Sequence, residues 1–348
     1  MKVLSLFSGV GGFDMGLENA GMETVFQCEW DKHANSILHK HWPDVPKWDD
    51  VSTLTGRHIL AHAPVIDVVA WGSPCQDLSV AGKRAGLEGG RSGLFHEGIR
   101  IIKELQEESN GQYPRISIWE NVVGALNSNR GADFGIILDE MAEAGALVIE
   151  WAVLDAQYFG VPQRRRRIYV TAIFDPVLAS RCPNPLLPVV ESLPRHLAKS
   201  KTKRKSAASS TPTSVGTDGQ WWDGRDTAEA LTTTSNEQRM PDKQRFQAIL
   251  QQTSTRLLGS NIIGSLNATD YKWPQNQQLD ENKFIVEPTM AVRRLTPLEC
   301  ERLMGWPDDH TRYKADGTEQ ADTHRYKQCG NGVASPVAQW IAKHILNI

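Results

Sequence analysis

The sequence predicts an α/β fold: a mostly parallel sheet with helices on both faces, interrupted by a polar insertion and completed by the C-terminus. Three observations lead to this prediction. Residues 1–175 alternate apolar runs with helical patterns, as successive βαβ units do. Residues 181–290 lose that alternation and are rich in Ser, Thr, Gln, Asn and Pro. Helical patterns return near residue 291, so the last segment is expected to rejoin the first domain.

The expected strands are short apolar runs at residues 3–7, 24–28, 65–70, 116–119 and 167–173. Apolar side chains at helical spacing predict the helices, at residues 13–20, 32–41, 99–107, 136–144, 297–304 and 335–346. Parallel strands joined by helices bring their carboxyl ends to one edge of the sheet, where such folds bind ligands. Side chains that follow a strand are therefore the first candidates for a functional site.

Composition excludes several classes of protein. The 348 residues are 40% hydrophobic and 23% charged, and no stretch approaches the roughly 20 apolar residues that span a bilayer. The N-terminus lacks the apolar core and cleavage site of a signal peptide. The five cysteines are scattered without metal-ligand spacing, and no third ligand accompanies His58 and His62. We expect a cytosolic protein that binds neither a membrane nor a metal.

The net charge of −3 does not by itself indicate a nucleic-acid partner, but the charge is uneven. Residues 181–290 carry a positive excess that begins with Lys199, Lys201, Lys203, Arg204 and Lys205. On charge alone, this basic run is either a solvated loop or a DNA contact. The choice between the two depends on motifs elsewhere in the chain.

A glycine-rich turn, Phe7-Ser8-Gly9-Val10-Gly11-Gly12, follows the first strand. Glycine has no Cβ, so backbone N–H groups in such a turn can approach a ligand closely. Asp14 stands where the fingerprint G-x-G-x-x-G requires its last glycine, which disfavours a nicotinamide cofactor. Glu29 ends the second strand, where an acidic side chain can bind ribose hydroxyls. The pair indicates either a nucleotide-type cofactor or a structural turn.

Three further groups lie at strand ends. Cys75, in Pro74-Cys75-Gln76, is either a nucleophile of lowered pKa or a small buried hydrophobe, and the glycine-rich stretch 82–94 after it suits a mobile lid or a solvated loop. Glu120, in Glu120-Asn121-Val122, supplies a carboxylate. The run from Gln163 to Arg167 is either a solvated patch or part of a site. Strand alternation would point Arg165 and Arg167 the same way.

In this order, the motifs resemble those of the DNA (cytosine-5) methyltransferase family, of the bacterial or phage type. The matching segments are Phe7 to Gly12, Glu29-Trp30-Asp31, Pro74-Cys75-Gln76, Glu120-Asn121-Val122, Gln163 to Arg167, Arg293-Arg294-Leu295-Thr296-Pro297-Leu298-Glu299-Cys300 and Gly330-Asn331-Gly332-Val333. Each tripeptide alone is weak, but seven in order at family-like spacing are highly specific. Residues 181–290 lie where the family has its variable target-recognition region, which favours DNA contact for the basic run.

The resemblance implies a cytoplasmic enzyme of the Rossmann-like, S-adenosylmethionine-dependent fold that methylates carbon 5 of a cytosine flipped out of a specific duplex DNA sequence. Cys75 would add to carbon 6, Glu120 would hold N3, and Arg165 and Arg167 would hold the carbonyl oxygen of the base. The implied division is a catalytic domain at 1–178, a small target-recognition domain at 179–290, and a C-terminal segment at 291–348 that returns to the first domain.

The same resemblance implies further ligand contacts. The residues expected to bind S-adenosylmethionine, with S-adenosylhomocysteine as product, are Phe7, Ser8, Gly9, Gly11, Glu29, Trp30, Asp50, Val51, Pro74, Leu94, Asn331 and Val333. The neighbouring Asp49 leaves the register at Asp50 open by one position. The residues expected to contact double-stranded DNA are Gln76, Ser79, Lys83, Arg84 and Arg91.

We expect a monomer that works beside a cognate restriction endonuclease, or an orphan or prophage methylase. The alternatives are an RNA (tRNA) cytosine-5 methyltransferase of the same fold, a catalytically inactive DNA-binding homologue, and a nicotinamide oxidoreductase. The long basic recognition segment disfavours the first of these. The presence of Cys75, Glu120 and Arg167 disfavours the second, and Asp14 disfavours the third.

Overall fold

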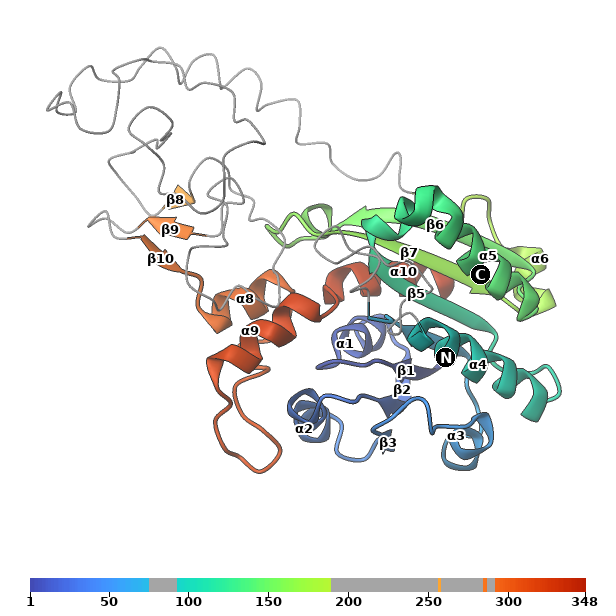
Figure 1. Cartoon of the computed structure of the whole chain (residues 1–348), viewed down its shortest axis with the longest axis horizontal. Coiled ribbons are helices and arrows are strands. Elements are labelled where there is room, and N and C mark those ends of the chain that lie inside the picture. The colour runs from blue at the N-terminus through green and yellow to red at the C-terminus, as the bar shows by residue number, and fades with distance from the viewer. Residues whose placement is uncertain (75–92, 189–255, 258–283, 287–291) are drawn as a thin grey trace, which may run out of the picture.

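The computed structural model describes residues 1–74, 93–188, 256–257, 284–286 and 292–348. Its main sheet has seven strands in the order β3-β2-β1-β4-β5-β7-β6 (Figure 1). These strands are β1 (Lys2–Leu6), β2 (Glu23–Cys28), β3 (Lys47–Trp48), β4 (Val68–Trp71), β5 (Ile116–Val122), β6 (Val148–Asp155) and β7 (Arg166–Ile173). The first five pair in parallel, and β7 runs antiparallel to both of its neighbours. The predicted, mostly parallel α/β sheet is confirmed.

Helices cover both faces of this sheet, also as predicted. They are α1 (Gly12–Glu18), α2 (Lys32–His41), α3 (Gly56–His62), α4 (Gly93–Glu108), α5 (Ala132–Glu143), α6 (Pro176–Arg181), α8 (Pro297–Leu303), α9 (Asp322–Asn331) and α10 (Ser335–Ile345). Successive side chains of a strand point to opposite faces, so Val3 joins the core under α1, α2 and α10, and Leu4 joins the core under α3, α4 and α5. The described chain has no helix both long and apolar enough to cross a membrane.

Several elements were not predicted, and each lacks the pattern on which prediction depends. β6 is an edge strand whose first four residues include no buried side chain, so it shows no apolar alternation. α9, with the sequence DTHRYKQCGN, is polar throughout, and α3 and α6 have only seven and six residues. A second, three-stranded antiparallel sheet of β8 (Arg256–Leu257), β9 (Phe284–Val286) and β10 (Val292–Arg294) precedes α8.

The C-terminal segment packs directly on the beginning of the chain, and α10 lies against α1 (Figure 1). A Cβ at Gly12 would lie 2.5 Å from the Val333 carbonyl oxygen, and one at Gly16 would lie 2.5 Å from the Ala338 Cβ. The two glycines therefore permit a helix contact that any side chain would prevent. The Ser335 hydroxyl donates to the Gly12 carbonyl at 2.8 Å, which fixes the position of this contact along α1.

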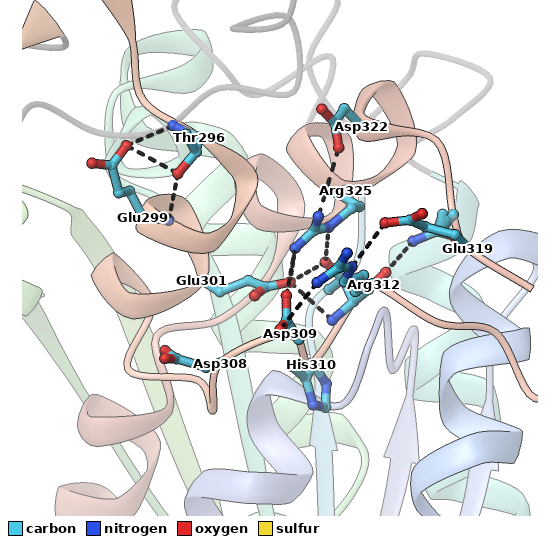
Figure 2. A network of polar contacts seen from close by, with 12 residues as sticks. Thr296, Glu299, Glu301, Asp308, Asp309, His310, Arg312, Glu319, Asp322 and Arg325 are labelled. Atoms are coloured by element: carbon cyan, nitrogen blue, oxygen red, sulfur yellow. Dashed lines mark hydrogen bonds and ion pairs between the residues drawn. The ribbon is translucent and has the colours of Figure 1, made fainter. Parts of the chain in front are cut away.

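A buried ion pair organises the segment between α8 and α9 (Figure 2). Glu301 is fully buried, and its Oε1 accepts hydrogen bonds from the Arg325 guanidinium at 3.1 Å and the Thr311 N–H at 2.9 Å. Next to Thr311, His310 donates from Nε2 to the Val10 carbonyl oxygen at 2.7 Å. Burial lowers the pKa of His310 to about 3, so the ring is neutral and its proton lies on Nε2. This network joins the C-terminal segment to the glycine turn.

Glu301→Ala should destabilise the protein by about 3 kcal/mol, because it leaves the Arg325 guanidinium buried with its main partner removed. Urea unfolding followed by circular dichroism measures the effect. The matched control is Asp308→Ala, which removes a carboxylate paired with Arg302 on the surface, where the two side chains are 54% and 59% exposed. Solvent screens that pair, so the control should change the midpoint little. Equal shifts in the two variants would show that the buried pair has no special importance.

Candidate active site

The predicted site residues that the structure describes are distributed among the segments at and beyond the carboxyl ends of β1, β2, β3, β4 and β5, the beginnings of α4 and β7, and the segment after α9. Those outside the described residues are Cys75, Gln76, Ser79, Lys83, Arg84 and Arg91, together with the basic run 199–205. In the described ranges no group of three or more His, Cys, Asp or Glu side chains could hold a metal ion.

The turn after β1 has a backbone shaped for close approach. Phe7, Gly9 and Gly11 have φ values of 54°, 58° and 83°, in the left-handed region that costs a side-chain-bearing residue such as Phe7 about 1–2 kcal/mol. A Cβ built on Gly9 would meet nothing within 4 Å, so this part of the turn faces open space. Gly11 lies instead under the Trp42 ring, 2.3 Å from where a Cβ would be. Ser8 is buried and donates to the Ser5 carbonyl oxygen at 3.0 Å.

Glu29 joins this turn to the end of β2. Its Oε2 accepts from the Gly9 N–H at 2.8 Å, and its Oε1 accepts from the Asp31 N–H at 2.7 Å. Burial raises the pKa of the Glu29 carboxyl, although these two hydrogen bonds act in the opposite direction. Trp30, which lies between Glu29 and Asp31 in the sequence, is 75% exposed. Lys327 of α9 forms an ion pair with Asp31 at 2.6 Å, so α9 is held next to the segment that follows β2.

The sequence left open whether Asp49 or Asp50 contacts the cofactor, and in the structure the two side chains have different partners. The exposed Asp49 accepts from the Asn35 side-chain amide of α2 at 2.6 Å. The half-buried Asp50 caps its own turn, with its Oδ1 accepting from the Ser52 N–H at 2.9 Å and hydroxyl at 2.7 Å. Val51, which follows, is buried in the core. Asp49 therefore contacts α2, whereas Asp50 stabilises the turn that follows β3.

An acidic residue, an exposed indole and an open glycine turn suit a nucleoside. The carboxylate of Glu29 lies beside Gly9, whose missing Cβ leaves room for a ligand, and the exposed Trp30 ring follows in the chain. Asn331 is exposed, and Val333 is buried against the backbone of Gly12. The residues present therefore fit the adenosine part of S-adenosylmethionine, for which the resemblance implies a ribose contact at Glu29.

The chain just before Cys75 is held firmly. Ser73, which precedes Pro74, accepts at its Oγ from the Trp119 indole N–H at 3.1 Å and at its carbonyl oxygen from the Asn121 amide at 3.2 Å. A Cβ on Gly72 would lie 3.3 Å from the Glu120 Oε2. The end of β4 is thus fixed beside Glu120. The anchoring role of Asn121 was not predicted, because it depends on contact between two strands.

Glu120 is a buried carboxyl with one close cationic partner. It is 9% exposed, and its Oε1 lies 3.1 Å from the Nε of Arg167. Burial raises the pKa of Glu120, and the nearby charges of Arg167 and Arg165 lower it in part. Strand pairing sets this geometry, because Val122 of β5 lies opposite Arg167 of β7.

Arg165 points inward as Arg167 does, in agreement with the predicted alternation, and is 3% exposed. It also makes contacts that the sequence did not indicate. Its guanidinium donates to the carbonyl oxygens of Gly330 at 3.1 Å and Gly332 at 2.6 Å, on either side of Asn331. Arg165 therefore connects the beginning of β7 to the segment that packs on the glycine turn.

Comparison with known proteins agrees with this arrangement. The family description "C-5 cytosine-specific DNA methylase" matches residues 1–347. The type II methyltransferase M.HpaII of Haemophilus parainfluenzae is 30% identical over 99% of this chain and 88% of its own length. M.Bsp6I of Bacillus sp. (strain RFL6) is 29% identical over 99% and 98%. The Dnmt2 methyltransferase of S. pombe shares the fold, with a TM-score of 0.59 at 16% identity over 100% of this chain and 98% of its own.

The family match spans nearly the whole chain, and the resemblance seen in the motifs is confirmed. Enzymes of this kind use S-adenosylmethionine as methyl donor, which agrees with the acidic side chain of Glu29 beside the open glycine turn. The chain belongs to the C-5 cytosine-specific DNA methylase family and is a DNA cytosine-5 methyltransferase.

Proposed function

We propose that this enzyme methylates a cytosine that is flipped out of duplex DNA, with Cys75 as nucleophile and with Glu120 and Arg167 holding the base. The observation that carries the proposal is the buried Glu120–Arg167 pair, which lies beside Gly72 where β4 leads toward Cys75. Flipping costs a few kcal/mol, and it is needed because carbon 6 is inaccessible inside the stack.

The proposed chemistry begins with the addition of the Cys75 thiolate to carbon 6, which forms a carbon–sulfur bond and pushes electron density toward carbon 5. Glu120, whose pKa is raised by burial, shares a proton with N3 and so relieves the negative charge on the ring. Arg167 holds the carbonyl oxygen of the base. When bound, S-adenosylmethionine would supply an electrophilic methyl group, so that carbon 5 gains the methyl group and S-adenosylhomocysteine is released. A base then removes the carbon 5 proton, the double bond re-forms, and the Cys75 thiolate leaves.

Arg165 is a positioning residue in this proposal. Because its guanidinium binds the carbonyl oxygens of Gly330 and Gly332, it holds Asn331 and Val333 next to the glycine turn. Glu29, Trp30 and Asp50 would then form the polar and aromatic surroundings of the cofactor. The further cofactor contacts predicted at Pro74 and Leu94 lie at the two ends of the gap that contains Cys75.

We further propose that residues 179–290 form the target-recognition domain. The three-stranded sheet of β8, β9 and β10 lies mostly within this range and leads into α8. We propose DNA contact for the basic run 199–205 and for Gln76, Ser79, Lys83, Arg84 and Arg91, which lie outside the described residues. The relatives named type II methyltransferases support a role beside a restriction endonuclease that recognises the same sequence.

The central test is bisulfite sequencing of DNA from a methylation-free bacterial host that expresses this protein or its Cys75→Ser variant. Wild-type protein should protect cytosines in one short sequence context, and the variant should protect none while still binding S-adenosylmethionine, because serine is a far weaker nucleophile. Near-normal protection by the variant would contradict the covalent mechanism. If soluble wild-type protein protected no cytosine, tRNA would be the next substrate to assay.

The pH dependence of turnover tests the role of Glu120. The required form is the protonated acid, so the rate should fall as the pH rises through the raised pKa of Glu120. The rate should also rise with pH as the Cys75 thiolate forms, which gives a bell-shaped profile. Glu120→Gln should lower single-turnover rates by about 10² or more and remove the falling limb. A variant profile that kept both limbs would assign the acid to another group.

Trp30→Ala tests the cofactor site. The exposed indole contributes little to the folded state, so its loss should leave unfolding unchanged and weaken S-adenosylmethionine binding by about 0.5–1.5 kcal/mol, or roughly threefold to tenfold. Isothermal titration calorimetry measures the affinity. The matched control is Trp151→Ala on the edge strand β6, where the indole is 47% exposed and packs on Phe134. Equal losses of affinity in the two variants would remove Trp30 from the site.

A further inference from the structure

The arginine run that leads into β7 is divided into two pairs by the alternating burial of its side chains. Arg165 and Arg167 point inward, toward Glu120 and the C-terminal segment. Arg164 and Arg166 alternate with them and are exposed. The proposed chemistry uses the inward pair, so the outward pair has no role in it.

The surroundings of the outward pair differ from those of the inward pair. In the part of the chain that the structure describes, neither guanidinium forms an ion pair or a hydrogen bond. Asp155 lies opposite Arg166 in the strand register, but its carboxylate accepts instead from the Gln157 side-chain amide at 2.6 Å and the Arg165 N–H at 3.0 Å. Two adjacent positive groups without a neutralising carboxylate create a positive potential that is available to an anion.

A third exposed arginine follows β5 at the same edge of the sheet. Val122, which pairs with Arg167, leads through the 3-10 turn Val123–Leu126 into the turn Ser128–Gly131. There Asn129 and Arg130 both have left-handed backbones, with φ values of 47° and 58°. Two consecutive non-glycine residues in this region are unusual, and such conformations concentrate at functional sites. The Arg130 side chain is exposed, and among the described residues it has no acidic partner.

We propose that Arg164 and Arg166, assisted by Arg130, bind the phosphodiester backbone of duplex DNA next to the flipped cytosine. A cytosine held by Glu120 and Arg167 stays linked through its deoxyribose to two phosphates, so its strand must cross this edge of the sheet. Guanidinium groups bind phosphate with paired, charge-assisted hydrogen bonds. The proposal rests on the proposed function, because it takes the position of the flipped base from the Glu120–Arg167 pair.

Backbone contacts and base contacts have different signatures. A phosphate contact adds about 0.9 to the slope of log affinity against log salt concentration and does not depend on sequence. Arg164→Gln and Arg166→Gln should each reduce the magnitude of this slope by about 0.9, and the double variant should reduce it by about 1.8. Arg167→Ala should lower turnover more than it weakens DNA binding and should leave the slope unchanged, because its guanidinium is paired with Glu120.

The experiment measures binding of a labelled duplex of mixed sequence, about 30 base pairs long, by fluorescence anisotropy between about 50 and 200 mM NaCl. The matched control is Lys343→Gln. Lys343 lies in the last turn of α10, outside the proposed recognition domain, is exposed and has no ion pair among the described residues. The control removes the same charge and should retain the wild-type slope, affinity and methylation rate.

Slopes lowered in the Arg164 and Arg166 variants but not in the Lys343 variant support the proposal. Equal slopes in all three variants and the wild type would overturn it, as would equal reductions in all three. Methylation of the duplex by the wild type is measured in parallel, with radiolabelled S-adenosylmethionine. Wild-type methylation with unchanged slopes contradicts only the phosphate contacts, whereas a wild type that methylates tRNA and not duplex DNA contradicts the proposed function. If the wild type methylates only tRNA, and the arginine variants change the salt dependence of tRNA binding but not of duplex binding, the proposed DNA contacts are also overturned.

Discussion

The close contact between the C-terminal segment and the glycine turn is the constraint on which the rest of the site depends. Gly12 lies against the backbone of Val333 without room for a Cβ, and the Ser335 hydroxyl binds the Gly12 carbonyl. The contact joins parts of the chain more than 300 residues apart. The ion pair of Arg325 with Glu301 and the hydrogen bond from His310 to Val10 hold the same segment in place. These contacts close the fold and bring Val333 to the glycine turn, where the proposal places the cofactor.

Two buried carboxyls at the edge of the sheet differ in what surrounds them. Burial raises the pKa of both Glu29 and Glu120. Glu29 accepts hydrogen bonds from two backbone N–H groups, which position its carboxyl between the glycine turn and β2. Glu120 faces the guanidinium of Arg167 and the backbone of Gly72. The first environment suits a fixed acceptor for hydroxyl groups, and the second suits a carboxyl that exchanges a proton with a base.

Strand periodicity separates functions within four consecutive arginines. Side chains alternate between the two sides along this segment, so Arg165 and Arg167 point to the interior and Arg164 and Arg166 to solvent. The interior pair differs again in its partners, since Arg167 contacts Glu120 and Arg165 contacts the carbonyls beside Asn331. One short segment thus connects the proposed base site, the cofactor corner and the surface that DNA would reach.

The sequence by itself determined the α/β fold, because its apolar runs and helical patterns alternate in βαβ order, and it placed Gly9, Glu29, Glu120 and Arg167 at strand ends or strand beginnings. Local pattern also predicted that Arg165 and Arg167 share a side of the strand. Edge strand β6 and polar helix α9 carry no such pattern, so only packing reveals them. Tertiary structure alone decided which carbonyls Arg165 binds, how Asn121 anchors Ser73, and that Asp49 rather than Asp50 is tied to α2. Each of these contacts joins residues distant in the chain, and distance along a sequence does not state which groups meet in space.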